Sequence, residues 1–427
     1  MNLTEIAIRP GDDEYDAARS TVFATAAPAL VVRPRTPGEV ADCLRHATAA
    51  GLPVAVRSGG HHLLGFGTLD DGVVIDLCRL DEVTVLDGSR VRVGGGATWG
   101  HVAERLRPHG LAITSGDTRS VGVGGLTQAG GIGWMVRKHG LTIDNLVAAE
   151  VVTAAGDVVR ASSTENPDLL WALRGGAGNF GVVTSFEFEA QPIRTIHFGT
   201  IGLALDDVPQ LLKGWAAAMR TAPEELSTTL VLAPDFGDQP PAAMVLVGYC
   251  GDDPTAIDPL RALGTVRFDD VSEREYADVL EDGGPPPGFL PVVGNTLVES
   301  VDDAVVSAIA AAYAGGRRVA FLRSLGGAVS RVPADATAYA HRSAEALVVS
   351  SALLPPDASD EQIEAARTVW RTVGDLGVGS YAGFLGSNTE ADLAALWPPA
   401  TRERLVELKR AWDPANTFRR TFNIAPS

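Results

Sequence analysis

The sequence predicts an α+β fold with two domains, and three observations support this prediction. At 427 residues the chain is too long for a single compact core, because domains usually hold roughly 50–200 residues. Glycine motifs crowd the stretch between Arg57 and Gly181, and they disappear from about Ile193 to Leu385. In that second region strand-like and helix-like runs alternate, a pattern typical of an antiparallel sheet covered by helices.

Clear start and stop signals delimit the elements of the first region. The run TPGE at 36–39 combines a capping box with proline at the first helical position, so it predicts a helix that ends at Gly51. Asp87-Gly88 is a turn signal between two strand-like runs. Further helices are expected at 97–110 and 167–176, and strands at 53–56, 73–77, 83–88, 90–96, 147–153, 157–161 and 180–190.

The second region is expected to form its own sheet and helices. A proline- and glycine-rich loop, DGGPPPG, interrupts this region at 282–288. From residue 402 onward the pattern predicts a helix followed by an extended tail. Strands are expected at 228–234, 242–250, 317–325 and 345–354, and helices at 206–220 and 360–374.

Net charge, cysteine spacing and hydropathy argue against several classes of protein. The formal net charge of −18 disfavours nucleic acid and anionic membranes as partners. The three cysteines, Cys43, Cys78 and Cys250, are far apart and form no CxxC pair, so we expect neither a disulfide framework nor a metal site. No signal-like start and no stretch of about 18 apolar residues is present, so we expect a cytoplasmic protein without a membrane segment.

The motif RSGGHH at 57–62 follows an expected strand and places a histidine beside two glycines. Glycines at such a turn remove the side chains that would hold a planar ligand away. His61 can then present a ring nitrogen to that ligand. Taken alone, the motif is better explained as a tight turn that carries a surface histidine, so it needs support from other motifs.

A second glycine cluster strengthens the case for a bound cofactor. The runs SVGVGG at 120–125 and GGIGW at 130–134 expose consecutive backbone N–H groups that can cradle a pyrophosphate. A Rossmann site, the alternative, requires GxGxxG between the first strand and helix of a βαβ unit. Here the spacing is GxGG and the position is mid-domain, so a nicotinamide enzyme is disfavoured. No Gly-Lys-Ser/Thr follows, which excludes a P-loop.

Three more segments complete the pattern: KHGLTIDN at 138–145, GGAGNFGVV at 175–183 and DPANTFRRTFNI at 413–424. Each alone is explained by glycine turns or by a helix stop. In this order, the five together resemble the FAD-linked oxidases of the vanillyl-alcohol oxidase/p-cresol methylhydroxylase (PCMH) superfamily, in particular the berberine-bridge-enzyme-like branch. The resemblance implies a PCMH-type FAD-binding domain of two packed α/β subdomains at 1–193. It also implies a substrate-binding domain at 194–395 and a C-terminal segment, 396–427, that returns to the FAD domain.

The resemblance assigns cofactor contacts residue by residue. His61 matches the histidine that is bonded to the flavin 8α-methyl group, and Asn423 matches a C-terminal strand residue that returns to the flavin. The surrounding pyrophosphate and flavin loop is matched by Arg57, Ser58, Gly59, Gly60 and His62. The second FAD loop is matched by Ser115, Gly116, Ser120, Val121, Gly122, Gly124 and Gly125, and later contacts by Gly131, Gly133, Asn145 and Val183.

Two departures from the family pattern affect the expected chemistry. Many relatives carry a second flavin link through a cysteine, but Thr118 occupies that position here, so a single covalent link is expected. Many relatives also carry Y-x-N-Y-x-D on a substrate-facing strand. This chain reads YAGFLG from Tyr381, and Phe384 replaces the tyrosine that serves as a base in some relatives.

The resemblance implies an FAD-dependent oxidase of small molecules. Hydride from an amine or alcohol carbon would pass to flavin N5, with O2 as the acceptor, giving hydrogen peroxide. A base would take the substrate proton, unless the substrate arrives as a neutral amine. We expect the base on a substrate-domain strand and rank Tyr381 first, with Tyr249, Tyr339 and His341 as secondary candidates; a buried core role is the alternative for each.

Phe384 and Trp397 are expected to give an apolar wall suited to an aromatic or alicyclic substrate. A flavin-dependent oxidative cyclase or dehydrogenase of secondary metabolism with another acceptor, and a flavin-binding protein without turnover, are the alternative functions. The sequence leaves the substrate and the oligomeric state open.

Overall fold

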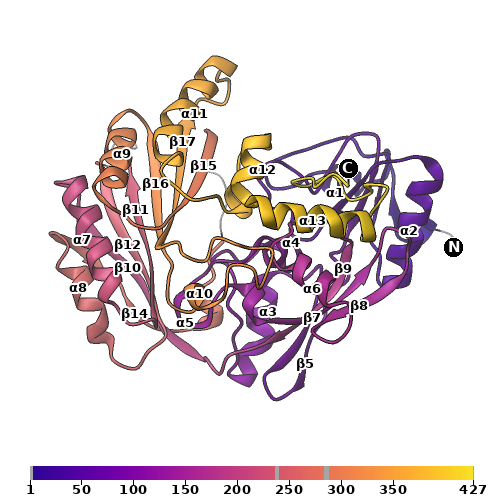
Figure 1. Cartoon of the computed structure of the whole chain (residues 1–427), viewed down its shortest axis with the longest axis horizontal. Helices are drawn as coiled ribbons and strands as arrows, with labels where there is room; N and C mark the ends of the chain where they lie inside the picture. Colours follow the sequence, from indigo (N-terminus) through magenta and orange to yellow (C-terminus); the bar gives the residue numbers. More distant parts are fainter. Residues whose placement is uncertain (1–2, 236–239, 283–287, 427) are drawn as a thin grey trace.

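The computed structural model describes residues 3–235, 240–282 and 288–426, and these form three β-sheets. Figure 1 shows the two smaller sheets on the indigo and purple side of the molecule, which also holds both chain ends, and the large sheet on the other side. The predicted α+β class is confirmed. Most of the loop predicted at 282–288 lies outside the described residues. Within the described part of the chain, no helix is long and apolar enough to cross a membrane.

The first sheet has the order β1-β2-β4-β3, in which β2, β4 and β3 run parallel. The predicted helix packs beside it as α2 and starts where Thr36 Oγ1 accepts from the Glu39 N–H at 3.2 Å. It ends at Gly51, whose φ of +65° is a left-handed conformation that favours glycine. The elements are β1 (Ala7–Ile8), α1 (Tyr15–Ala18), β2 (Leu30–Val32), α2 (Pro37–Ala50), β3 (Val54–Arg57) and β4 (Val73–Asp76).

The second sheet is antiparallel, with the order β5-β6-β9-β7-β8. Its core is aromatic: Trp99 and Phe188 are fully buried, with ring centroids 5.9 Å apart. The glycine-rich stretch that precedes β7 contains a short helix, α4. The elements are β5 (Val83–Asp87), β6 (Arg90–Gly94), α3 (Trp99–Leu106), α4 (Val123–Ala129), α5 (Val136–His139), β7 (Leu146–Val152), β8 (Val158–Ser162), α6 (Pro167–Leu173) and β9 (Val182–Glu189).

The third sheet is the predicted antiparallel sheet, with the order β13-β10-β12-β11-β16-β17-β15 and with β14 also paired to β10. Helices α7, α9 and α11 cover one face of it (Figure 1), where Trp215 and Leu322 are fully buried in a shared core. Its strands are β10 (Thr195–Ala204), β11 (Leu226–Ala233), β12 (Ala242–Tyr249), β13 (Val266–Asp269), β14 (Ser272–Glu275), β15 (Leu290–Val298), β16 (Arg318–Ser324) and β17 (Ala346–Leu354). The helices of this region are α7 (Val208–Thr221), α8 (Asp258–Arg261), α9 (Asp303–Ala314), α10 (Ala328–Arg331) and α11 (Asp360–Gly374).

The chain then crosses back through α12 (Glu390–Leu396) and α13 (Pro399–Trp412), drawn in yellow in Figure 1. The predicted helix and extended tail are confirmed, and α13 contacts α6 of the glycine-rich side. The C-terminal segment therefore packs against the glycine-rich side of the molecule. The boundaries at 193/194 and 395/396 stay a prediction.

Two segments expected as strands are not strands. Ala382–Phe384 forms a 3₁₀ turn, because the Asn295 side chain takes both backbone groups of Tyr381: its Nδ2 donates to the carbonyl at 3.1 Å and its Oδ1 accepts from the N–H at 2.7 Å. Asn423 lies in a tail without ladder pairing. There the Asn179 side chain donates to Phe422 O and accepts from the Ile424 N–H. In both places an asparagine side chain makes the backbone hydrogen bonds that a neighbouring strand would otherwise make.

Candidate active site

A cavity of about 760 Å³ lies between the glycine loops and the uncovered face of the large sheet. Its walls come from the loop after β3, the stretch 116–134, strands β15–β17, the turn at 381–384 and the C-terminal tail. Cavities of about 300–1,000 Å³ with mostly apolar walls are typical of cofactor and small-molecule sites.

Two of the glycine loops pack back to back at one wall of this cavity. A methyl group on Gly59 would lie 2.3 Å from the Gly122 nitrogen, and one on Gly122 would lie 2.1 Å from the Gly59 nitrogen. Ser58 Oγ holds the same contact by donating to Gly95 O at 2.7 Å and accepting from the Gly124 N–H at 3.2 Å. The loops can therefore approach this closely only because neither glycine has a side chain.

We predict that Gly122→Ala disrupts cofactor binding, whereas Gly38→Ala, at an exposed position in α2 away from the cavity, does not. The new methyl group at Gly122 meets backbone that cannot move aside, and overpacking of this kind usually costs about 1–3 kcal/mol. A methyl group on Gly38 would meet nothing closer than Thr36 Oγ1 at 3.8 Å. Flavin content per protein and the unfolding midpoint should fall only for Gly122→Ala. Equal losses in both variants would contradict the loop-packing argument.

The neighbouring histidines His61 and His62 differ in availability. Both ring nitrogens of His62 are engaged: Nδ1 accepts from the Leu64 N–H at 3.2 Å, and Nε2 lies 3.3 Å from Ala382 O. Burial lowers the pKa of His62 to about 4, against a smaller opposing effect of the Ala382 carbonyl. Burial also lowers the pKa of His61, and no described residue hydrogen-bonds to its ring. His61 is therefore the neutral imidazole that remains free at the cavity wall.

The structure brings twelve of the predicted cofactor residues to the cavity wall and leaves six away from it. Those at the wall are Arg57, Ser58, Gly59, Gly60, His61, His62, Gly116, Val121, Gly122, Gly124, Gly125 and Val183. Those away from it are Ser115, Ser120, Gly131, Gly133, Asn145 and Asn423.

Several of the residues away from the wall support the residues that form it. A methyl group on Gly133 would lie 2.0 Å from the Ser115 carbonyl oxygen, so this pair allows two backbone segments to pass closely. Asn145 donates to His139 O at 2.9 Å and to Leu141 O at 3.1 Å, which fixes the turn before β7. Asn423 differs from these, because its buried Oδ1 has no hydrogen-bond partner among the described residues.

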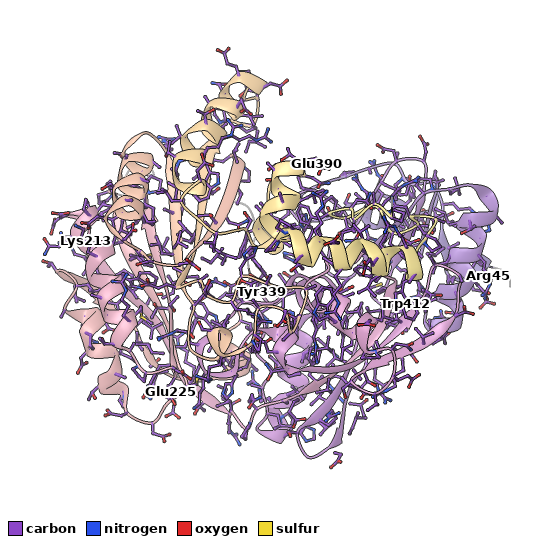
Figure 2. All side chains as sticks on the ribbon, in the orientation of Figure 1. Arg45, Lys213, Glu225, Tyr339, Glu390 and Trp412 are labelled. Atoms are coloured by element: carbon purple, nitrogen blue, oxygen red, sulfur yellow. The ribbon has the colours of Figure 1, made fainter. Side chains whose placement is uncertain are left out.

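Tyr381 is the one predicted base candidate that lines the cavity described here, and Phe384 lines it as well. Tyr339 lies near the middle of the molecule (Figure 2) and packs against Gly130 and Arg342. Tyr249 ends β12 and is buried in the helix-side core. Neither Tyr339 nor Tyr249 therefore lines the cavity.

His341 and Trp397 have structural partners. His341 Nε2 lies 2.9 Å from Ala395 O and 3.2 Å from Leu396 O, which ties its loop to α12. Trp397 Nε1 donates to Gly175 O at 3.0 Å, so Trp397 does not form the apolar wall expected of it. Tyr381 lies at a turn, and Tyr339 and His341 lie in a loop, so none of these three is on a strand. Of the three, Tyr381 alone lines the cavity. The expectation that the candidates sit on strands is therefore wrong for these three.

Sequence reasoning missed an ion pair between the two sides of the cavity. Arg323 of β16 pairs with Asp117, donates to Ile132 O at 3.0 Å and lies 5.8 Å from the Trp134 ring centroid. Burial raises the pKa of Asp117, but the charge and hydrogen bond of Arg323, together with hydrogen bonds from backbone and from Thr118, outweigh this effect, so the net pKa is lowered. Asp117 precedes Thr118 in the cofactor motif, which is a local signal, but nothing in the sequence links it to Arg323, 206 positions away.

A second missed residue is Gln128, which lies on α4 at the cavity wall. Its Nε2 donates to Gly124 O at 3.1 Å, and its buried Oε1 has no partner among the described residues. Unpaired buried oxygens at a cavity wall are atoms that a polar ligand can satisfy.

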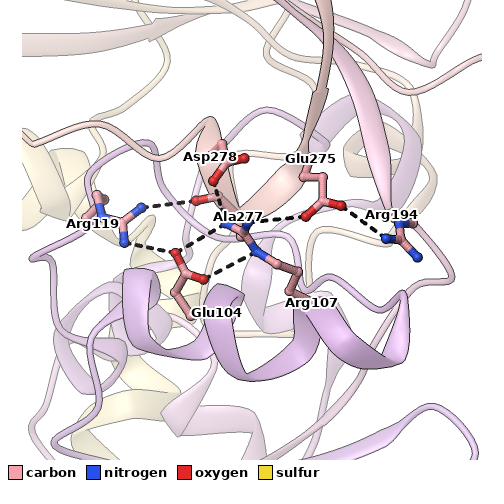
Figure 3. Close-up of polar contacts among 7 residues, drawn as sticks. All are labelled: Glu104, Arg107, Arg119, Arg194, Glu275, Ala277 and Asp278. Carbon is pink, nitrogen blue, oxygen red and sulfur yellow. Dashed lines mark hydrogen bonds and ion pairs between the residues drawn. The ribbon is translucent and has the colours of Figure 1, made fainter.

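A network of polar contacts links the stretch 275–281 to α3 and to the loop that carries Arg119 (Figure 3). The side chains of this network do not line the cavity. Arg107 at the end of α3 and Arg119 of the motif loop both pair with Glu104, and Arg119 also donates to Ala277 O at 3.1 Å. Each exposed pair contributes little alone. The network consists of Glu104, Arg107, Arg119, Arg194, Glu275, Ala277 and Asp278.

The backbone continues the same connection towards the cavity. The Arg119 N–H donates to Glu281 O at 2.8 Å, and the Glu281 N–H donates to Asp117 O at 2.9 Å. Thr118 and Glu281, both at the cavity wall, thus form a parallel bridge between the two halves of the site.

A closely packed pair of glycine loops, a free neutral histidine and an unpaired buried oxygen on Gln128 line a large apolar cavity. These features fit a flavin, and they define an FAD-linked oxidoreductase. Residues 28–162 match the family model described as an FAD binding domain. The chain is 31% identical to (R)-6-hydroxynicotine oxidase of Paenarthrobacter nicotinovorans over 421 residues, which cover 93% of this chain and 91% of that protein.

Solved structures agree over the whole chain. 6-Hydroxy-D-nicotine oxidase of Arthrobacter nicotinovorans superposes with a TM-score of 0.86 at 30% identity, covering 99% of this chain and 98% of that one. Xylooligosaccharide oxidase of Myceliophthora thermophila, in complex with xylobiose, gives 0.87 at 26% identity, with the same coverage. The chain belongs to the berberine-bridge-enzyme-like branch of the vanillyl-alcohol oxidase/PCMH superfamily, and it is an FAD-dependent oxidase.

Proposed function

We propose that His61 forms a single covalent bond to the 8α-methyl group of FAD, and that the enzyme oxidises a small-molecule amine or alcohol with O2 as acceptor, giving hydrogen peroxide. The contrast between His61 and His62 carries this proposal. His62 is held by Leu64 and Ala382, whereas His61 presents a neutral ring to the cavity. Thr118 stands where a second link would require cysteine. The bound flavin supplies a hydride acceptor at N5.

The glycine loops and the unpaired Gln128 oxygen would hold the cofactor. Backbone at Gly59, Gly60 and Gly122 lines the cavity without side chains in the way. The buried Gln128 Oε1 at the cavity wall can accept from a ligand N–H or hydroxyl. Arg57 has a different task, because its guanidinium is held by Asp76 at 2.8 Å and so fixes the start of the loop.

Tyr381 is suited to orient the substrate rather than to remove a proton. Burial raises the pKa of Tyr381 to about 12, so the phenol stays protonated near neutral pH. Its oxygen accepts from the Gly131 N–H at 3.2 Å, and its O–H has no acceptor among the described residues. We propose that this O–H donates to the substrate, which then arrives as a neutral amine or loses its proton to water.

We predict that Tyr381→Phe lowers kcat about tenfold and leaves the shape of the pH profile between pH 6 and 10 unchanged. Loss of one hydrogen bond of about 1–1.5 kcal/mol explains a change of this size. A general base contributes about 10²–10⁴-fold. Steady-state rates across this pH range would check the prediction. A hundredfold loss together with loss of a pH-dependent limb would make Tyr381 the base.

The proposed oxidase activity is tested by reducing the flavin anaerobically with a panel of amines and alcohols and then admitting air. The flavin absorbance should bleach with a substrate and return rapidly, with one hydrogen peroxide formed per flavin. Slow return without peroxide would indicate a dehydrogenase or oxidative cyclase with another acceptor. A flavin that no member of a broad panel reduces would contradict turnover of this substrate class.

A further inference from the structure

The cavity face of strands β15, β16 and β17 forms an ordered apolar grid. Alternate residues of a strand point to the same side, and the lining residues follow this spacing on all three strands. Cross-strand pairing places Val293 and Val319 on either side of Ser351, Val349 beside Phe321, and Pro291 beside Leu353. The sheet grid consists of Pro291, Val293, Val319, Phe321, Val349, Ser351 and Leu353.

The polar side chains next to this grid on β16 and β17 are already engaged. Ser350, the neighbour of Ser351, points to the helix side, where Arg318 donates to it at 2.8 Å. Arg323, at the end of β16, is held by Asp117 and by Ile132 O. Among the described residues, Ser351 therefore carries the one hydroxyl group on the sheet grid. Strands lie about 4.8 Å apart, so three strands give a flat apolar face roughly 10 Å wide.

We infer that this enzyme takes a substrate with a flat hydrocarbon body, aromatic or alicyclic, and rejects oligosaccharides. The inference rests on the proposed function and specifies its substrate class. A hydrocarbon ring gains from covering the sheet grid, because apolar area leaves water. A sugar ring that lies flat on the sheet grid leaves the hydroxyls that face the grid without partners, and two unpaired hydroxyls weaken binding at least about 30-fold. The selectivity comes from the sheet grid rather than from Trp397.

The test is anaerobic isothermal titration calorimetry of the purified holoenzyme at pH 8 with quinoline and with xylobiose. Neither the covalent bond nor oxygen chemistry is needed for this readout. Quinoline is a neutral two-ring aromatic at this pH and should bind at least 30-fold more tightly than xylobiose. Its binding should also show a negative heat-capacity change, the mark of apolar burial. Tighter binding of xylobiose would overturn the inference.

Three substitutions locate the binding on the sheet grid. Ser351→Val should tighten quinoline about threefold and Val349→Thr should weaken it about threefold, because each changes about one methyl group of apolar contact. Val158→Thr makes the same exchange as Val349→Thr at a valine that is 48% exposed on β8, and it should change nothing. If quinoline binds equally to all four proteins, it binds elsewhere and the inference fails. If Ser351→Val and Val349→Thr change the affinity for quinoline as expected but acid releases the flavin from the protein, the proposed covalent bond is contradicted. The inferred substrate class is then still supported.

Discussion

Replacing His61 with alanine is expected to leave acid-precipitated protein colourless, whereas the wild-type pellet stays yellow. The imidazole is the proposed nucleophile, and alanine leaves no atom at this position that could bond to the flavin. His62 cannot substitute, because its Nδ1 accepts from Leu64 and its Nε2 lies against Ala382. Mass spectrometry of the tryptic peptide that spans position 61 should show the FAD adduct in the wild type and the plain peptide mass in His61→Ala.

Thr118→Ala is the matched control, since it changes the position where relatives carry the second link. It should keep the yellow pellet and the adduct at position 61. A wild-type peptide without adduct, from a host that makes FAD, would limit the account to non-covalent FAD. An adduct that persists in His61→Ala would place the bond on a different residue.

Lys409→Met is expected to lower the free energy of unfolding by about 3–5 kcal/mol, because it leaves a buried carboxylate without its partner. Both side chains of the Lys409–Asp413 pair are fully buried, and their atoms lie 2.7 Å apart. Lys409 Nζ also donates to Asn179 O at 2.9 Å and to Phe418 O at 3.0 Å. Burial lowers the pKa of Lys409, and Asp413 opposes this effect. Denaturant unfolding measures the loss.

The same substitution should reduce flavin content, because this pair anchors the tail that forms part of the cavity wall. Phe418, Arg420, Thr421 and Phe422 all reach that wall. Arg402→Met, which removes an exposed pair with Glu390, is the control and should cost less than about 1 kcal/mol. Lys409→Met/Asp413→Asn should regain part of the stability, because no charge is then left unpaired. No regain would show that the hydrogen bonds matter more than the charge.

Local signals predicted much of the fold. The helix at 37–50 was bounded correctly because Thr36 and Gly51 act through neighbours within the same turn. The antiparallel sheet was expected from alternating apolar runs, and it is present. The strand predictions at Tyr381 and Asn423 were wrong for a non-local reason. Asn295 and Asn179 satisfy the backbone there, and both asparagines lie far away in the sequence.

By itself, the sequence determined the flavin class, the histidine proposed to hold the flavin, and the absence of a cysteine for a second link. These features depend on short runs of glycine and histidine in which neighbours in sequence are neighbours in space. Only the tertiary structure decided which aromatic residues reach the cavity: Tyr381 and Phe384 do, whereas Tyr339 and Trp397 are packed elsewhere. Strand alternation defines two faces, but it does not tell which face meets helices and which meets a ligand. That depends on how segments about 200 residues apart, such as those that carry Asp117 and Arg323, come together.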